Sequence, residues 1–573
     1  MNTKIRRLAI GLLVCYLALF VQLNILQVGK QEELTEDPRN DRQTTREFNR
    51  PRGPILAADG TVLARSVPVT DPDDHFKYQR EYPQGALFGN ITGYYSYVYG
   101  STQLERQVGD VLTGSTSEQQ LQALTNILGG SDPTGSVVTT LQPDVQQLAA
   151  DLLGNRDGSI IVMDPATGAI IAMYSSPTYD PNQVADHDIN SVNAVLDFLN
   201  ANPGKPLLAN TYQERYMPGS AFKVITTGIA LSNGITTLDR PFAVETEYVP
   251  PQTTDPIGNY GGSSCGGSMI EVFFRSCNTP FARMAIELGP EKMVNGTKAW
   301  GIGEKLPIDL PGAVASSFGD VEDFTDSLPL LAIGGFGQGN DVMVPLHMAM
   351  VAATVANGGK MMAPHVIDAT LYHDGSVLRR TEPEVWKTPI SPEVAAQLSI
   401  LMTGVVNEGT GRTMQLANGI QAAGKTGTAQ LNSTGEPQRS HAWIIGFAPV
   451  EAPKYAIAVM LKGTTDEISA STGGKLCGPI AKQILDYLFA RDAAAAVTTT
   501  TEPIGAATTL PGTPSATTVP GAPTTTRPAT TTPPATTSPA ATSPVTTAAP
   551  VTLPPTTLPP TPTTAPPASG APP

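Results

Sequence analysis

The composition of the last part of the chain limits most strongly what this sequence can fold into. From about Val497 to Pro573 the residues are almost only Thr, Pro, Ala and Ser, and about 20 of the 52 prolines lie there. Such a segment cannot bury enough apolar surface to offset the entropy lost on ordering it. We therefore expect residues 494–573 to form an extended, mobile tail with polyproline II character. Its Thr-Pro richness would also permit O-glycosylation outside a cell.

An apolar run near the N-terminus decides the compartment. Leu8 to Leu23 is apolar and is preceded by three basic residues: Lys4, Arg6 and Arg7. A helix from Leu8 to about Val28 has about 20 residues, which is close to the span of a hydrocarbon core. Because basic residues stay on the cytoplasmic side, we expect residues 1–30 to be a single-pass membrane anchor with the rest of the chain outside the cell. A cleaved signal peptide is the alternative, but no small-x-small cleavage signal ends the run.

The charge balance and the cysteine pattern exclude two kinds of site. The chain has 36 basic and 51 acidic residues, which gives a net charge of -15, and the tail contributes only one acid and one base. A surface of this kind does not bind phosphate backbones, so we expect no nucleic acid partner. The four cysteines include no CxxC pair and no HExxH motif is present, so we also expect no zinc site.

A small β-rich region is expected directly after the anchor. A polar connector, Gln31–Arg52, reads as a stalk or an extended strand that leads into it. Short β-rich runs then alternate with Gly and Pro turns, at Val62–Val67 and Tyr94–Val98, and one helix is expected over Glu118–Leu128. We call this region, residues 31–155, the pedestal.

Residues 156–493 have the pattern of a larger α/β domain. Ser159–Met163 and Ala169–Ser175 flank an Asp-Pro…Gly turn and predict a β-hairpin. A long helical middle, rich in Ala and Gly, extends to about Gly419. Three strands and a helix follow: Lys425–Gln430, His441–Phe447, Tyr455–Leu461 and Pro479–Ala490. This order predicts an antiparallel sheet that gathers strands from both ends of the domain and is flanked by helices.

A serine and a lysine one helical turn apart are the first candidates for chemistry. Pro218 and Gly219 break the chain before a helical run, which places Ser220 at a helix N-terminus with Lys223 on the same face. A neutral Lys223 amine could take the Ser220 proton, and the positive helix end favours the developing anion. Because a chain of this size holds about one or two Ser-x-x-Lys motifs by chance, a capped amphipathic helix is the simpler explanation of this motif alone.

Two further motifs follow along the chain. Ser276-Cys277-Asn278 comes just after the apolar run Met269–Phe274, where ordinary helix-start polarity also explains it. Lys425-Thr426-Gly427-Thr428 opens a predicted strand. Its lysine and two hydroxyls offer an anchor for a carboxylate, and Gly427 lets another backbone lie close along that strand.

Together and in this order, the three motifs resemble the S-x-x-K, S-x-N and K-T-G set of penicillin-binding proteins and serine β-lactamases. The resemblance covers roughly residues 45 to 490 and is to the class B penicillin-binding proteins. Cys277, in place of Asp, departs from the β-lactamase pattern. Other segments also resemble class B motifs: Arg52-Gly53-Pro54-Ile55, Asp59-Gly60, Leu63-Ala64, Leu104-Glu105, Gly337-Gln338-Gly339, Asn357-Gly358-Gly359 and Trp443. The first three resemble the entry to the non-catalytic, dimerisation-like domain of that class, and Leu104-Glu105 fits the same domain.

The resemblance implies a D,D-transpeptidase of peptidoglycan synthesis that is a target of β-lactams. Ser220 would attack the penultimate D-Ala carbonyl of a stem peptide ending in D-Ala-D-Ala, with Lys223 as the base. Ser276 and Asn278 would relay protons and orient Lys223 and the substrate amide. The third motif would hold the terminal carboxylate, through Lys425, Thr426, Gly427 and Thr428. The resemblance implies no metal or organic cofactor, and it implies a membrane-embedded glycan polymerase of the SEDS type as a partner.

The three motifs also occur in proteins with other functions, and most of those functions require an additional domain, residue or partner. A bifunctional enzyme needs a glycosyltransferase domain of roughly 200 residues, which the pedestal is too short to hold. A β-lactamase needs a deacylating group, and no Glu-x-x-Leu-Asn segment lies between Asn278 and Lys425. A β-lactam sensor should couple to a cytoplasmic effector, whereas only a short stub precedes the anchor. A D,D-carboxypeptidase, with water as the acceptor, stays open.

Cys265 and Cys277 raise the question of a disulfide. Outside the cell a pair of thiols persists in oxidised form, and closing a loop of about a dozen residues stabilises a fold by roughly 3 kcal/mol. Glycines around Cys265 would let the loop bend back. The alternative is that Cys277 is a buried thiol and Cys265 is free, because the run after Met269 looks helical and could hold the sulfurs apart.

Overall fold

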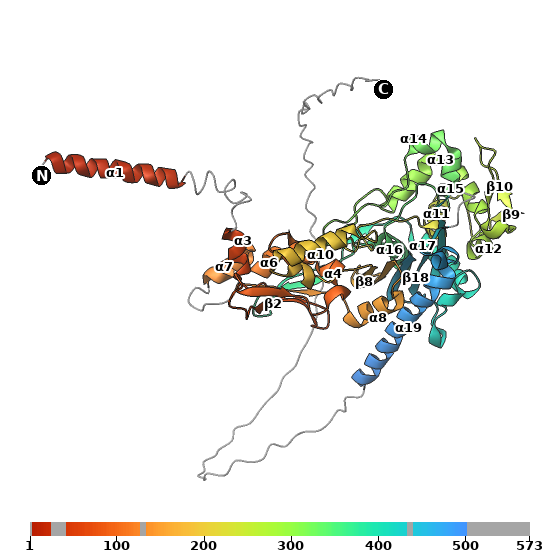
Figure 1. Ribbon diagram of the computed structural model, residues 1–573. Coiled ribbons are helices and arrows are strands. Elements are labelled where there is room, and N and C mark those ends of the chain that lie inside the picture. Colours follow the sequence, from red (N-terminus) through yellow and green to blue (C-terminus); the bar gives the residue numbers. More distant parts are fainter. Residues whose placement is uncertain (1–2, 25–41, 126–132, 433–438, 501–573) are drawn as a thin grey trace, which may run out of the picture. The chain divides into compact units, whose positions relative to one another are not determined.

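A five-stranded antiparallel sheet forms the centre of the larger α/β domain expected over residues 156–493, which we call the catalytic part. The computed structural model describes residues 3–24, 42–125, 133–432 and 439–500 (Figure 1). The sheet has the order β17-β18-β19-β7-β8. Its strands are β7 (Gly158–Met163), β8 (Ile170–Ser176), β17 (Ala423–Gln430), β18 (Ser440–Ala448) and β19 (Tyr455–Leu461). The first and last segments of the domain therefore pair side by side, through β7 and β19, and this predicted sheet is confirmed.

Both faces of this sheet are buried, which explains the continuous apolar runs of its strands. Ile161 and Met163 pack into one hydrophobic cluster, whereas Ile160 and Val162 pack into another on the opposite face. Two helices in mutual contact cover the second face (Figure 1): α8 (Pro143–Leu153) and α19 (Gly473–Thr500). Helix α16 (Pro345–Ala356) lies on the first face against β18 and β19, and α17 (Pro392–Asn407) packs beside β17.

The segment between β8 and β17 is less purely helical than its composition predicts. Its remaining helices are α9 (Asn182–Ala185), α10 (Ile189–Ala201), α11 (Lys223–Ser232), α12 (Met269–Phe274), α13 (Thr279–Ala299), α14 (Val321–Asp326) and α15 (Leu328–Gly334). Short paired strands interrupt them: β9 (Pro241–Glu245) with β12 (Cys265–Ser268), β10 (Glu247–Tyr248) with β11 (Ile257–Gly258), and β13 (Met361–Met362) with β16 (Val385–Lys387). Runs of two to five residues carry too little periodicity to be seen in the sequence.

A six-stranded sheet holds the pedestal together and has the order β15-β14-β6-β1-β2-β3. Four of its strands lie in the pedestal: β1 (Ile55–Leu56), β2 (Val62–Pro68), β3 (Tyr78–Glu81) and β6 (Ser136–Thr139). The other two, β14 (Ile367–Leu371) and β15 (Val377–Arg380), come from far along the chain. The sheet therefore crosses the expected boundary at residue 155, because β14 pairs antiparallel with β6.

A buried ion-pair cluster explains two of the quoted pedestal motifs. Glu105 has no exposed surface, and its carboxylate contacts Arg80 at 2.6 Å and Arg52 at 3.1 Å. Glu105 lies on α5 (Gln103–Gln107), which contacts α4 (Gly89–Thr92) and α6 (Gly109–Thr113). Between α4 and α5 along the chain, β4 (Tyr95–Ser96) and β5 (Gly100–Ser101) form a small antiparallel pair. A buried carboxylate requires such partners, so these motifs serve the fold of the pedestal.

The structure of the two end regions of the chain matches the expectations from the sequence only in part. Helix α1 (Thr3–Asn24) is long and apolar enough to cross a membrane, as predicted. The connector is not extended throughout, because α3 (Arg42–Phe48) forms there and Phe48 stacks on Tyr95 at 4.4 Å. The expected helix at residues 118–128 is α7 (Ser117–Thr125), and its last residues lie outside the described part. Helix α19 continues past the expected end to Thr500. The rest of the predicted tail, residues 501–573, lies outside the described part of the chain.

Candidate active site

Ser220 lies in a tight turn that is held from two sides. It belongs to a 3-10 turn, Gly219–Phe222, that leads into α11. Gly219 has a φ of 53° and donates its N–H to the carbonyl of Gly337 at 2.9 Å. A side chain at Gly219 would meet the Thr428 carbonyl at 2.6 Å. The turn therefore places Ser220 between β17 and the Gly-Gln-Gly segment that the sequence singled out.

Lys223 lies at the start of α11 and is completely buried. Its Nζ donates to the carbonyl of Ser276 at 2.8 Å, to the carbonyl of Cys277 at 2.6 Å and to Oδ1 of Asn278 at 2.9 Å. Burial holds the pKa of Lys223 well below its ordinary value, and the nearby charge of Lys425 lowers it further. A lysine whose pKa is lowered in this way is better suited to accept a proton from a neighbouring hydroxyl than an ordinary lysine.

The second motif follows the end of α12, where the chain reverses direction. Ser276 has a φ of 59°, which is unusual for a residue with a side chain, and the N–H of Cys277 bonds back to Val272 at 3.0 Å. Asn278 is fixed at the start of α13, because its N–H donates to Oδ1 of Asn259 at 2.7 Å. The side chains of Ser276 and Asn278 both face Lys223 as a result.

Lys425 enters the same network from strand β17. It is completely buried, and its Nζ donates to Oγ of Ser276 at 2.8 Å, while Nζ of Lys223 lies 3.5 Å from the same oxygen. Burial lowers the pKa of Lys425 to about 7. One hydroxyl thus links the two lysines of the first and third motifs, which are far apart in the sequence.

Gly427 gives β17 room to run against the serine turn. A Cβ atom at this position would lie 2.5 Å from the carbonyl of Pro218 and 3.1 Å from the N–H nitrogen of Ala221. The expected close approach of another backbone is therefore real, and the partner is the turn that carries Ser220. Trp443 on β18 fixes the same turn, because its Nε1 donates to the Met217 carbonyl at 2.9 Å.

The motifs share the wall of one cavity of about 400 Å³. Ser220, Ser276, Asn278, Thr426 and Thr428 line it, together with side chains from the Gly-Gln-Gly segment and from residues 258–261. The two lysines lie behind this wall, where both reach Ser276. In the described part of the chain, no three His, Cys, Asp or Glu side chains gather in a way that could hold a metal ion.

Several residues of the site are missing from the sequence-based set, and two of them contact the predicted motifs directly. Thr410 lines the cavity, and its hydroxyl lies 2.6 Å from that of Thr426. Asn259 holds Asn278 in place. The glycines that flank Thr410 in Glu408-Gly409-Thr410-Gly411 were a signal that the chain turns there, whereas a single Asn in a Gly-rich loop gives no signal.

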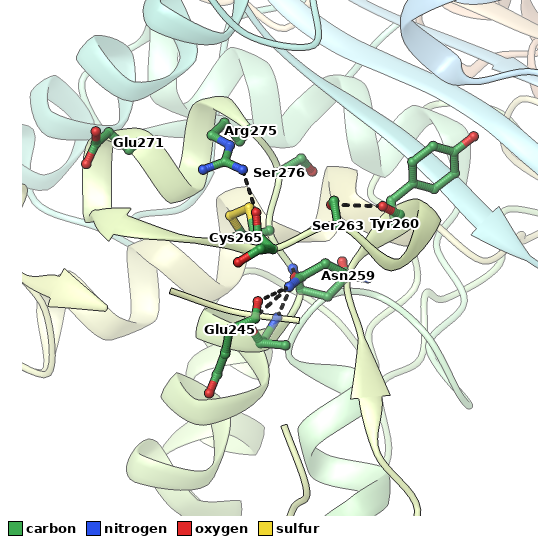
Figure 2. Close-up of a disulfide and its surroundings, with 12 residues drawn as sticks. Glu245, Asn259, Tyr260, Ser263, Cys265, Glu271, Arg275 and Ser276 are labelled. Atoms are coloured by element: carbon green, nitrogen blue, oxygen red, sulfur yellow. Dashed lines mark hydrogen bonds between the residues drawn. A yellow bond between two sulfur atoms is a disulfide. The ribbon is translucent and has the colours of Figure 1, made fainter. Parts of the chain in front are cut away.

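Cys265 and Cys277 form a disulfide (Figure 2), with their Cα atoms 5.7 Å apart. Helix α12 ends at Phe274, which lets the reversal at Ser276 bring Cys277 back towards β12. Gly266 lies so close to β9 that a Cβ there would be 2.3 Å from the carbonyl of Ala243. The short helix α12 and the close packing at Gly266 thus let Cys265 and Cys277 come near enough to bond, which a longer helix would have prevented.

Comparisons with known proteins agree with this geometry. The family of the penicillin binding protein transpeptidase domain matches residues 158–486, and that of the penicillin binding protein A dimerisation domain matches residues 52–138. The peptidoglycan D,D-transpeptidase PbpA of Mycolicibacterium smegmatis is 38% identical over 496 residues, which cover 84% of this chain and 98% of the relative. PbpA of Mycobacterium tuberculosis is 36% identical over 85% and 99% of the two chains.

A solved structure shows the same likeness. The penicillin G acyl-enzyme complex of penicillin-binding protein A from M. tuberculosis matches with a TM-score of 0.70 and 34% identity, over 77% of this chain and 100% of that one. The short pedestal and the Ser-Cys-Asn motif also resemble those of actinobacterial penicillin-binding protein A. The transpeptidase-domain match over more than half of the chain, with relatives that align over nearly their whole length, shows that the chain belongs to the class B penicillin-binding proteins.

Proposed function

We propose that the protein is a peptidoglycan D,D-transpeptidase in which Ser220 forms the acyl-enzyme. One observation carries this assignment: the buried amines of Lys223 and Lys425 both reach the hydroxyl of Ser276, in the wall of a cavity that Ser220 also lines. Such an arrangement offers a nucleophile, a base with a lowered pKa and a cation for a carboxylate within one site. The names of the relatives and the acyl-enzyme complexes of M. tuberculosis penicillin-binding protein A support it.

Acylation would begin with the transfer of the Ser220 proton to the neutral amine of Lys223. Oγ of Ser220 then bonds to the carbonyl carbon of the penultimate D-Ala, and the backbone N–H groups of Ser220 and Thr428 hold the oxyanion, at about 3 kcal/mol per donor. The bond to the terminal D-Ala breaks, and its nitrogen takes the proton back through Lys223 and Ser276. Lys425 and Thr426 hold the carboxylate of the leaving D-Ala during this step.

The second half of the reaction uses an amine from a neighbouring stem peptide. The amine attacks the ester carbonyl, its proton passes to Lys223, and the Ser220–acyl bond breaks to return the hydroxyl. With water as the acceptor the same residues would perform D,D-carboxypeptidation. A β-lactam acylates Ser220 because it mimics D-Ala-D-Ala, and its ring opens so that the lactam nitrogen receives the proton.

The location and the partner follow from the family and from α1. We propose that α1 anchors the chain in the cell membrane with its N-terminus inside and the catalytic domain outside, because Lys4, Arg6 and Arg7 directly precede the apolar run. A SEDS-type glycan polymerase in the same membrane would supply the strands to be cross-linked. The family resemblance supports this pairing, and co-purification from detergent-solubilised membranes tests it.

A fluorescent penicillin tests the assignment of the nucleophile. The wild-type protein should gain one adduct that maps to the peptide containing Ser220, and Ser220→Ala should gain none. An adduct on another residue, or one that survives the substitution, would disprove the mechanism. Incubation with a D-Ala-D-Ala peptide and an added amine separates transpeptidation, which gives a cross-linked product, from carboxypeptidation, which releases only D-Ala.

A further inference from the structure

The cavity that Ser220 lines contains no acidic side chain. None of the described residues that line it is Asp, Glu or Lys, and Arg275 is its one arginine. The chain as a whole has more acidic than basic residues, 51 against 36, whereas the described wall carries one basic side chain and no carboxylate. The potential inside such a cavity favours anionic ligands, and the one basic side chain on the wall, that of Arg275, is the natural contact for them.

Arg275 precedes Ser276, lines the cavity and is exposed to solvent, which places it at the rim. Its Nη2 donates to the carbonyl of Ser264 at 2.7 Å, which uses one of its five N–H donors. Among the described residues it makes no salt bridge within 4.0 Å; Glu271, one turn earlier, attracts it electrostatically but accepts its hydrogen bonds from the N–H and the hydroxyl of Ser268. The guanidinium thus keeps most of its hydrogen-bonding capacity for a ligand.

The backbone that carries Arg275 is tied to its neighbour by two adjacent links. Arg275 bonds to Ser264, and two residues further along Cys277 is joined to Cys265 (Figure 2). These links connect the same two segments, so the rim residue is held on a cross-linked loop. A cation held in place binds a ligand with less loss of entropy than a free side chain does.

We propose that Arg275 is a specificity-determining residue that binds a second carboxylate, located in the acyl part of the donor substrate. This rests on the proposed function, in which the buried Lys425 already holds the terminal carboxylate. Lys425 lies behind the wall, whereas Arg275 lies at the rim, so the two cations suit two separate anionic groups. The preferred donor is thus a stem peptide with a free carboxylate, rather than a carboxamide, in the residues that precede D-Ala-D-Ala.

Two penicillins that differ by one carboxylate test this proposal. Carbenicillin carries a carboxylate on its acyl side chain and benzylpenicillin does not, so the ratio of their second-order rate constants for acylating Ser220 reports recognition of that group. In Arg275→Gln this ratio should fall by about two- to fivefold, as expected for loss of a solvent-exposed ion pair. Arg275→Lys should keep most of the ratio, and raising the salt concentration should lower it in the wild type and in Arg275→Lys but not in Arg275→Gln.

Arg215→Gln is the matched control. Arg215 is also exposed and also donates to a backbone carbonyl, that of Ala315, but it does not line the cavity. An unchanged ratio in Arg275→Gln, or an equal fall in Arg215→Gln, would overturn the proposal. Both of these outcomes still require that the penicillins acylate Ser220, so they leave the proposed function intact, whereas a failure of benzylpenicillin to label Ser220 in the wild type would refute that function instead. A D,D-peptide pair with a carboxylate or a carboxamide side chain should give the same change in the ratio of kcat/KM.

Discussion

At the scale of single residues, the burial of the Lys425 amine lowers the stability of the fold, although the reaction needs this amine. Lys425 is completely buried without a carboxylate partner among the described residues, and its pKa is about 7 against an ordinary value of 10.5. Between these two values the unfolded chain binds more protons than the folded one, so the free energy of unfolding rises with pH. Below about pH 7 the lysine is charged in both states and the cost of its burial is fully present.

Replacement of this lysine should therefore stabilise the protein while abolishing its reaction. We expect Lys425→Met to raise the free energy of unfolding by about 1–4 kcal/mol at pH 6. The gain should shrink as the pH approaches 10, and labelling by penicillin should be lost because no cation holds the carboxylate. Thermal melting at several pH values measures the first effect, with the exposed Lys475→Met as the control. A gain that grows with pH would contradict the assignment of a buried ammonium.

The contact at Gly427 leads to a second prediction at this scale. An alanine there would place its Cβ 2.5 Å from the Pro218 carbonyl, so β17 must move away from the turn of Ser220. We expect Gly427→Ala to slow acylation by penicillin at least about tenfold, since a shift of about 1 Å can cost a hundredfold in rate. Stopped-flow labelling measures the rate. Gly109→Ala is the control, because the nearest atom to its Cβ is 3.7 Å away, and a similar loss there would refute the steric explanation.

At the scale of elements, the disulfide controls how α12 ends. It joins β12 to the reversal that holds Ser276 at a positive φ, so its removal should loosen both. We expect Cys265→Ser to lower the free energy of unfolding by roughly 3 kcal/mol and to slow acylation. A thiol count on the denatured, non-reduced ectodomain should give one free thiol, that of the buried Cys477. Three free thiols would mean that the pair is reduced and that packing alone holds the second motif.

At the scale of the whole chain, the pedestal and the catalytic part share structure. Strands β14 and β15 complete the pedestal sheet from within the catalytic sequence, and Gln146 on α8 bonds to the backbone of Met173 on β8. A fragment that starts at residue 156 loses β6 and α8 and exposes the edge of β14 and one face of the central sheet. We expect it to aggregate or to melt well below a fragment of residues 45–493. Equal melting temperatures would show that the catalytic part is independent.

The sequence by itself determined the family, the three motifs, the apolar N-terminal helix and the strands of the central sheet. These features are local, because an apolar strand such as Tyr455–Leu461 or a motif such as Ser220-Ala221-Phe222-Lys223 is complete within a few residues. Only the tertiary structure decided which distant segments meet: Lys223 with Lys425 at Ser276, Thr410 with Thr426, and β14 with β6. Such contacts depend on the pairing and packing of whole elements, and local periodicity carries no record of the partner.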